Sequence, residues 1–353
     1  MRVAIITDTH FGARNDNQNF SEYFFKFYEE HFFPYLKENN ITHCLHLGDI
    51  MDRRKFVSYR TAKNFRERFI KPFSDLGIQL HILVGNHDTY FKNTNEVNSI
   101  TELIGTRYDN VHIYPEAKEI ELDGLPVMLV PWINASNHAK TMSAMDKSKA
   151  DILMGHLEVQ GFEMIKGVHC ENGYAKDLFR KFDTVFSGHF HIKSDDGHIY
   201  YLGNPYEIYW NDCGDKKGFH IFDTETRQLD RIVNPLTIYK KIYYDDITTN
   251  YKDHDITQYK ENYVKIIVVN KKDLYQFDQF VDKLLRADCY EVKVIEDFSD
   301  LDANTVSDDI VENTQDTMTI LNLYIDDIET SLDKGRLKNL QRQIYMEAQD
   351  LQI

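Results

Sequence analysis

Short apolar runs alternate with longer amphipathic stretches along the first 235 residues of the chain. The apolar runs have the length of buried β-strands and lie at Val3–Ile6, Cys44–Leu47, Leu80–Val84, Val127–Val130, Ile152–Met154 and Thr184–Phe186. Longer stretches between them predict helices at Glu22–Lys37, Ser58–Asp75 and His138–Lys147. Because strands and helices alternate, we expect a layered α/β architecture.

The pattern changes after residue 235 and divides the chain into four predicted parts. Residues 1–235 form the α/β core. Residues 236–298 form a small α/β domain, with strands at Tyr263–Val269 and Tyr290–Ile295 on either side of a helix at Leu274–Arg286. Residues 299–317 are rich in Asp, Asn, Ser and Thr and predict a flexible acidic linker. Residues 318–353 carry two amphipathic stretches and predict a helical hairpin.

Polar clusters follow five of the predicted strands of the core. They are Asp8-x-His10, Gly48-Asp49, Gly85-Asn86-His87-Asp88, Gly155-His156 and Gly188-His189-x-His191. One such histidine alone is more often a satisfied structural residue than a ligand. Glycine lets the chain turn sharply after a strand, and ligands of α/β sheets bind outside the carboxyl ends of strands. The joint pattern therefore predicts one site whose carboxylate, amide and imidazole groups suit a pair of divalent metal ions.

The net charge of −16 does not by itself favour a nucleic-acid substrate. Half of that charge lies in residues 299–353, which hold 12 acidic and 4 basic side chains. A basic run, Arg53-Arg54-Lys55, begins four residues after Asp49. Such a run is either a solvated face or, beside a metal site, a contact to the DNA backbone.

The remaining composition points to a folded protein of a reducing compartment. The four cysteines are scattered with no C-x-x-C pair, which fits the cytoplasm. No apolar run approaches the roughly 20 residues of a membrane span, and no signal peptide is visible. We therefore expect no membrane association.

The order of the clusters resembles the signature of the calcineurin-like metallophosphoesterase superfamily over roughly residues 1–225. The resemblance implies a two-sheet β-sandwich flanked by helices. It also implies two metal ions, one held by Asp8, His10 and His191, the other by Asn86, His156 and His189, with Asp49 bridging them. His87 corresponds to the general acid that protonates the leaving group. Asp88 would orient the His87 ring, or would alternatively cap the turn.

The order of domains resembles the nuclease subunits of SbcCD-type DNA repair complexes, and most of all the recombination endonuclease subunits of T-even-like bacteriophages. That resemblance implies double-strand exonuclease and single-strand endonuclease activity with Mn²⁺ or alternatively Mg²⁺. It implies a homodimer within a heterotetramer, in the host-cell cytoplasm for a phage protein. The small domain would position DNA, and the hairpin would dock on the coiled coil of an ABC-type ATPase through Leu321, Tyr324, Ile328, Leu340, Ile344 and Tyr345.

Three readings remain open at this point. The metal site suits a DNA nuclease, and it equally suits a phosphatase or phosphodiesterase of small substrates, for which the added domains have no evident use. A catalytically inactive scaffold would be expected to have lost ligands. The hairpin stripes would alternatively pack on their own core or form a homodimer. One departure concerns Asp52, which stands where some cellular members of the nuclease family carry a second catalytic histidine.

Overall fold

The computed structural model describes residues 1–165, 168–295, 325, 332–338 and 340. It divides into two compact units, the first comprising Met1–Ile208 and Gly214–Ile238, the second Tyr209–Cys213 and the chain from Tyr239 onward. The predicted linker and most of the predicted hairpin, including Leu321, Tyr324, Ile328, Ile344 and Tyr345, lie outside the described residues. Leu340 is described, and its side chain is 54% exposed.

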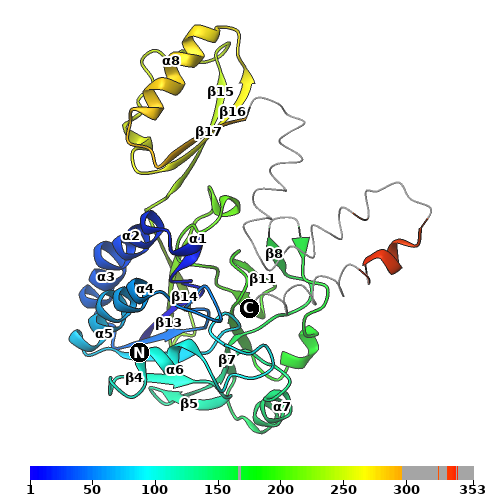
Figure 1. Ribbon diagram of the computed structural model, residues 1–353. Coiled ribbons are helices and arrows are strands. Elements are labelled where there is room, and N and C mark those ends of the chain that lie inside the picture. The colour runs from blue at the N-terminus through cyan, green and yellow to red at the C-terminus, as the bar shows by residue number, and fades with distance from the viewer. Residues whose placement is uncertain (166–167, 296–324, 326–331, 339, 341–353) are drawn as a thin grey trace. The chain divides into compact units, whose positions relative to one another are not determined.

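The first unit contains two six-stranded mixed sheets, seen in the lower part of Figure 1. The first sheet has the order β14(Leu229–Val233), β13(Gly218–Asp223), β1(Arg2–Ile6), β2(His43–His46), β3(Gln79–Leu83), β4(Val111–Tyr114). The second has the order β11(Ser194–Asp195), β12(Ile199–Tyr201), β10(Thr184–Gly188), β7(Ile152–His156), β6(Leu125–Val130), β5(Lys118–Leu122). A separate short ribbon pairs β8(Glu163–Ile165) with β9(Val168–His169).

The two large sheets share one hydrophobic core. Side chains from both sheets meet in it, among them Ile5 and Leu45 from the first and Leu129, Met154 and Phe186 from the second. All five are at most 2% exposed. Since β1, β2 and β3 run parallel, as do β6, β7 and β10, the carboxyl ends of these strands gather at one edge of each sheet. The two-sheet sandwich implied by the sequence is confirmed.

Helices cover the outer faces of the sandwich. Two long helical runs each contain a π-helical turn: α2(Gln18–Phe27), η1(Tyr28–Phe32) and α3(Phe33–Glu38), then α4(Tyr59–Asn64), η2(Phe65–Ile70) and α5(Lys71–Asp75). The first run begins before the predicted Glu22 because the Asn17 side chain accepts hydrogen bonds from the main-chain N–H groups of Asn19 and Phe20. The other helical segments are α1(Ala13–Asp16), α6(Ser99–Ile104), α7(His138–Lys147), η3(Lys176–Phe179) and η4(Trp210–Asp212). Among the described helices, none has both the length and the apolar character needed to cross a lipid bilayer.

The second unit is a three-stranded parallel sheet with one helix on it. Its sheet has the order β15(Tyr239–Asp245), β16(Tyr263–Asn270), β17(Glu291–Ile295), and it carries η5(Thr257–Tyr259) and α8(Leu274–Leu285). The helix buries Phe277, Phe280 and Leu284 against the sheet, whereas Leu274 is 63% exposed.

Two features of this unit differ from the prediction. Strand β15 was not predicted. Residues 209–213 were predicted to belong to the first domain, but they pack with the second unit. The Trp210 ring lies 4.3 Å from the Tyr239 ring, and the Lys265 ammonium lies 4.4 Å from the Trp210 ring.

Candidate metal centre

The predicted ligands come together where strands of the two sheets end. Asp8 follows β1 and Asp49 follows β2, and the Asp8 N–H donates to the Gly48 carbonyl across these strand ends at 3.0 Å. The second sheet joins the same place, because the His189 N–H after β10 donates to the Asp8 carboxylate at 3.0 Å. The polar ends of both sheets thus form one site.

Glycines allow this close approach. Gly48 has φ +100°, and a Cβ atom there would lie 2.6 Å from Nδ1 of His156. A Cβ atom at Gly85 would lie 2.2 Å from the Asp49 carboxylate. Any other residue at either position would push a predicted ligand out of place, so the glycines of the clusters serve the geometry of the site.

The backbone at four of the predicted ligands is left-handed. The φ angles are 53° at Asp8, 44° at His10, 55° at Asp49 and 88° at His189. Such conformations are unfavourable for residues with a Cβ atom, and they concentrate at functional sites, where the surrounding structure imposes them. The sandwich therefore holds the backbone of these residues in conformations that they would not choose alone.

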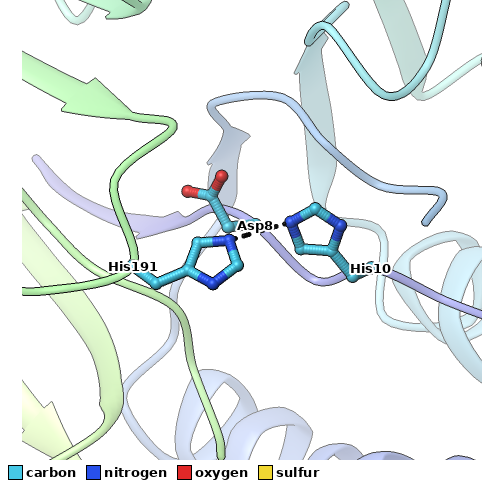
Figure 2. A group of neighbouring side chains, drawn as sticks. All are labelled: Asp8, His10 and His191. Atoms are coloured by element: carbon cyan, nitrogen blue, oxygen red, sulfur yellow. Dashed lines mark hydrogen bonds between the residues drawn. The ribbon is translucent and has the colours of Figure 1, made fainter. Parts of the chain in front are cut away.

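The first group of side chains consists of Asp8, His10 and His191, whose possible ligand atoms all lie within 4.8 Å of one another. Figure 2 shows the two imidazoles turning nitrogens toward one another, with Nε2 of His10 3.0 Å from Nε2 of His191. Ligand nitrogens around a single divalent ion are spaced by roughly 3 Å, given metal–nitrogen bonds of about 2 Å. The group fits one metal ion.

The second group consists of Asn86, His156 and His189. The Asn86 Oδ1 atom lies 2.9 Å from Nε2 of His156 and 3.0 Å from Nδ1 of His189. The other nitrogen of His156, Nδ1, lies 2.7 Å from the Leu47 carbonyl oxygen. A carbonyl behind a ligating imidazole fixes its tautomer and leaves the opposite nitrogen for the metal.

Asp49 lies between the two groups. Its Oδ2 atom is 3.3 Å from Nε2 of His156 and 3.9 Å from Nε2 of His10, while its Oδ1 atom accepts the His87 main-chain N–H at 2.8 Å. One carboxylate oxygen therefore faces imidazoles of both groups. The structure brings all seven predicted ligands together in the arrangement that the resemblance implies.

The electrostatics of the site favour bound cations. Burial opposes the charge of Asp49, yet the neighbouring imidazoles, above all His156, hold its pKa well below the usual range. Burial likewise opposes the charge of His156, but the Asp49 carboxylate raises its pKa to about 9. Burial raises the pKa of Asp8 to about 7. Without positive charge from elsewhere, the buried carboxylates thus draw protons into the site, and the oxygen and imidazole donors fit divalent metals that would replace them.

His87 and Asp88 make different contacts from those predicted. The Asp88 carboxylate accepts hydrogen bonds from the main-chain N–H groups of Ile50, Met51 and Gly85 at 2.9–3.0 Å. The Nδ1 atom of His87 instead lies 2.5 Å from the Asp52 carbonyl oxygen. The predicted orientation of the His87 ring by Asp88 is therefore corrected in favour of the turn-cap alternative, because the carboxylate ties together the turns after β2 and β3.

The basic run separates into three different environments. Arg53 donates to the Asn15 side chain at 2.8 Å and lies 3.7 Å from the Asp16 carboxylate. Arg54 is largely buried, which lowers its pKa against the pull of the Asp49 charge, and its Nη1 atom is buried without a hydrogen-bond partner among the described residues. Lys55 is exposed.

Two supporting residues carry no sequence signal. The Lys217 ammonium, 3% exposed, donates to the main-chain carbonyl of His191 at 3.2 Å. The Tyr206 hydroxyl donates to the Thr9 carbonyl, between Asp8 and His10, at 2.6 Å. Both residues lie far from the ligands in sequence, so only the tertiary structure reveals that they support ligand-bearing segments.

Residues 1–193 match the family model described as calcineurin-like phosphoesterase. The chain belongs to the calcineurin-like phosphoesterase family. Membership of this family makes it a hydrolase of phosphoesters, and the two groups of side chains around Asp49 correspond to a site for two metal ions.

Relatives of this phosphoesterase include proteins named as nucleases or exonuclease subunits. It is 33% identical to exonuclease subunit 1 of Enterobacteria phage T4 over 319 residues, which cover 89% of this chain and 90% of the relative. It is 25% identical to a nuclease subunit of SbcCD from Staphylococcus epidermidis over 187 residues, 44% of this chain and 48% of the relative. Among solved structures it resembles a dimetal phosphatase from Danio rerio, with 10% identity over 66% of this chain and 95% of that chain, and a TM-score of 0.41.

Proposed function

We propose that this phosphoesterase is a DNA nuclease that hydrolyses phosphodiesters with two divalent metal ions, Mn²⁺ by preference. The observation that carries the proposal is the position of the Asp49 carboxylate oxygen between the imidazoles of His10 and His156. DNA as the substrate is supported by the 33% identity to a phage exonuclease subunit along most of the chain. The expected activities are double-strand exonuclease and single-strand endonuclease.

The residues divide the work of hydrolysis. Asp8, His10 and His191 would hold one ion, Asn86, His156 and His189 the other, and Asp49 both. When bound, such a pair supplies positive charge that polarises the phosphodiester and acidifies the attacking water. A ring nitrogen of His87 lies within 4.8 Å of ligand atoms of His10 and Asp49. His87 is therefore placed to protonate the departing oxygen, and the Asp52 carbonyl holds its ring in one tautomer.

The other parts of the chain fit a nuclease subunit. Residues 236–298 would help to position DNA, residues 299–317 would form a tether, and residues 318–353 would dock on the coiled coil of an ABC-type ATPase. Two copies of each subunit would make a heterotetramer in the cytoplasm. Support for this assembly comes from the two relatives, each named as a subunit of a nuclease.

One assay separates the nuclease from its alternatives. Purified protein with Mn²⁺ is incubated with end-labelled duplex DNA, with hairpin DNA and, separately, with a p-nitrophenyl phosphate diester. The proposal expects DNA fragments that disappear when the metal is chelated. Hydrolysis of the small diester with intact DNA would favour the small-substrate phosphodiesterase, and inactivity on every substrate at full metal occupancy would favour the scaffold.

A further inference from the structure

Exposed aromatic rings of the first unit are confined to two short segments. Among its described residues, the Phe, Tyr and Trp side chains classed as exposed are Phe56 (60%), Tyr59 (97%), Tyr90 (42%) and Phe91 (49%). All other aromatic side chains of this unit are at least partly covered. We call these four side chains the aromatic rim. Exposed aromatic groups gathered in this way commonly mark a binding surface.

The two segments of the rim meet at the metal centre. Phe56 follows Asp52 by four residues, and Tyr90 follows His87 by three. The contact of 2.5 Å between the Asp52 carbonyl oxygen and His87 Nδ1 joins the two segments. The first segment is also fixed beside the ligand His10, because the Thr61 hydroxyl donates to Asp16, in the turn that follows it, at 2.5 Å.

The rim carries positive charge in a strongly acidic chain. Residues 53–63 contain five Lys and Arg and no Asp or Glu, and residues 89–94 contain one Lys and no acid, although the whole chain has a net charge of −16. The Arg53 guanidinium lies over the Phe56 ring, 4.8 Å from its centroid. The Tyr90 and Phe91 rings contact one another in a T-shaped arrangement at 4.8 Å. Cations interleaved with exposed rings suit a ligand that has both phosphates and aromatic bases.

A second copy of this chain fits the surface less well. In a two-fold dimer the same patch faces itself, so the cations of residues 53–63 would meet the same cations of the partner. A duplex also fits poorly, since its bases are stacked on one another and present no open face to a protein ring. An unpaired strand exposes the base faces and the phosphates together.

We infer that the aromatic rim binds unpaired DNA, stacking bases on Phe56, Tyr59, Tyr90 and Phe91 while the neighbouring cations hold the phosphates, and so leads a single strand to the metal centre. The inference rests on the proposed nuclease function and names the form of DNA that the site takes. Duplex ends would have to fray before their strand reached His87.

Binding measurements with two kinds of strand test the inference. A fluorescent single strand and an abasic strand of equal length are titrated with full-length protein in the His87→Gln background, in which cleavage is slow. Stacking on one aromatic ring contributes enough that its loss weakens binding roughly tenfold. We expect Phe56→Ala with Tyr59→Ala, and separately Tyr90→Ala with Phe91→Ala, to weaken binding of the natural strand by about that factor or more. Binding of the abasic strand should not change.

Control variants make the result specific to the rings. Tyr59→Phe should bind as the parent does, whereas Tyr59→Leu, which keeps apolar area without an aromatic face, should bind as weakly as Tyr59→Ala. Tyr275→Ala removes an aromatic side chain that is 72% exposed in the second unit, and it should leave strand binding unchanged. Melting temperature and metal content establish that each variant is folded.

Two outcomes would overturn the inference. The first is equal affinity of parent and rim variants for the natural strand. The second is sedimentation showing that the rim variants lose self-association while strand binding persists, which would make the surface a contact between copies. The nuclease proposal fails differently: the parent protein would then hydrolyse a p-nitrophenyl diester but cleave no DNA, whatever the rim contains.

Discussion

The Nδ1 atom of His87 lies 2.5 Å from the main-chain carbonyl oxygen of Asp52. A carbonyl oxygen can only accept, so Nδ1 carries a hydrogen and Nε2 is the nitrogen that exchanges a proton with the substrate. A neutral carbonyl fixes the tautomer without the strong increase in basicity that a carboxylate partner would give. The loop after the bridging carboxylate thereby sets the orientation of the predicted general acid.

Replacing His87 should separate proton transfer from metal binding. His87→Gln is expected to keep two metal ions per chain and to lose about 10²–10⁴-fold in the rate of DNA hydrolysis, the usual contribution of positioned acid–base catalysis. A diester with a p-nitrophenolate leaving group needs no proton and should be slowed much less. Rates on both substrates and metal analysis make the test. Equal losses on the two substrates would assign His87 a role in positioning or metal binding.

Replacing Asp49 should disrupt both metal sites. Asp49→Ala removes the carboxylate oxygen that faces His10 and His156, so two cations would be left without a bridge to offset their repulsion. We expect loss of at least one ion and of all hydrolysis, measured by elemental analysis and by the DNA assay. Asp183→Ala, which removes an exposed carboxylate, is the control and should keep both. Two ions per chain in Asp49→Ala would contradict the bridging assignment.

Replacing Asp88 should cost stability more than chemistry. Asp88→Ala leaves three buried main-chain N–H groups without their acceptor, at roughly 1–3 kcal/mol each. The expected result is a loss of several kcal/mol in the free energy of unfolding, measured by urea denaturation. Asp88→Asn retains one acceptor oxygen and should fall between the two. A variant with unchanged stability and a His87-like loss of rate would restore the orienting role to Asp88.

Acid should destabilise the fold through the histidines of the first sheet. Burial, reinforced by nearby His112 and His43, lowers the pKa of His81 to about 3. Since the unfolded chain binds this proton near pH 6.5, the stability contributed by the neutral ring is complete above that pH and is lost as the pH falls toward 3.

The magnitude is measurable. Between pH 6.5 and 5 the loss attributable to His81 is about 1–2 kcal/mol. Urea unfolding at the two pH values should therefore show a smaller pH dependence for His81→Phe than for the parent protein. His138→Phe, at an exposed position, should behave as the parent. Identical pH dependence in all three proteins would show that His81 does not couple folding to protonation.

Truncation tests the proposed docking segment. A chain ending after Phe298 should fold, bind two metal ions and retain Mn²⁺-dependent nuclease activity, because the ligands and both sheets precede that point. It should fail to associate with the ATPase subunit and lose any stimulation by ATP. Co-purification with that subunit in equal amounts would show that residues 318–353 are not the docking element.

The sequence predicts the strands and their polar ends well because both signals are local. An apolar run followed by glycine and a ligand-type residue is legible without the fold, as at Gly48-Asp49 and Gly188-His189. Contacts between distant segments are not legible in this way. The donation from Lys217 to the His191 carbonyl and the bond between His87 and Asp52 both depend on how the loops pack.

Strand β15 shows a second limit. Its sequence, Tyr239–Asp245, places two lysines next to one another and buries Tyr239, Ile242 and Tyr244 without strict alternation. The period of two residues that marks a half-buried strand is therefore absent from the sequence. Its parallel pairing with β16 supplies the order that the pattern lacks.

The left-handed backbone at Asp8, His10, Asp49 and His189 has a consequence for how the protein acquires its metal ions. Each such conformation costs of order 1–3 kcal/mol, and the folded sandwich bears that cost before any ion arrives. Binding then needs little reorganisation, and releasing an ion does not release the strain. The cage should stay assembled when emptied, so one divalent ion can be exchanged for another in the folded state, and the metal supply of the cell decides which ion the enzyme carries.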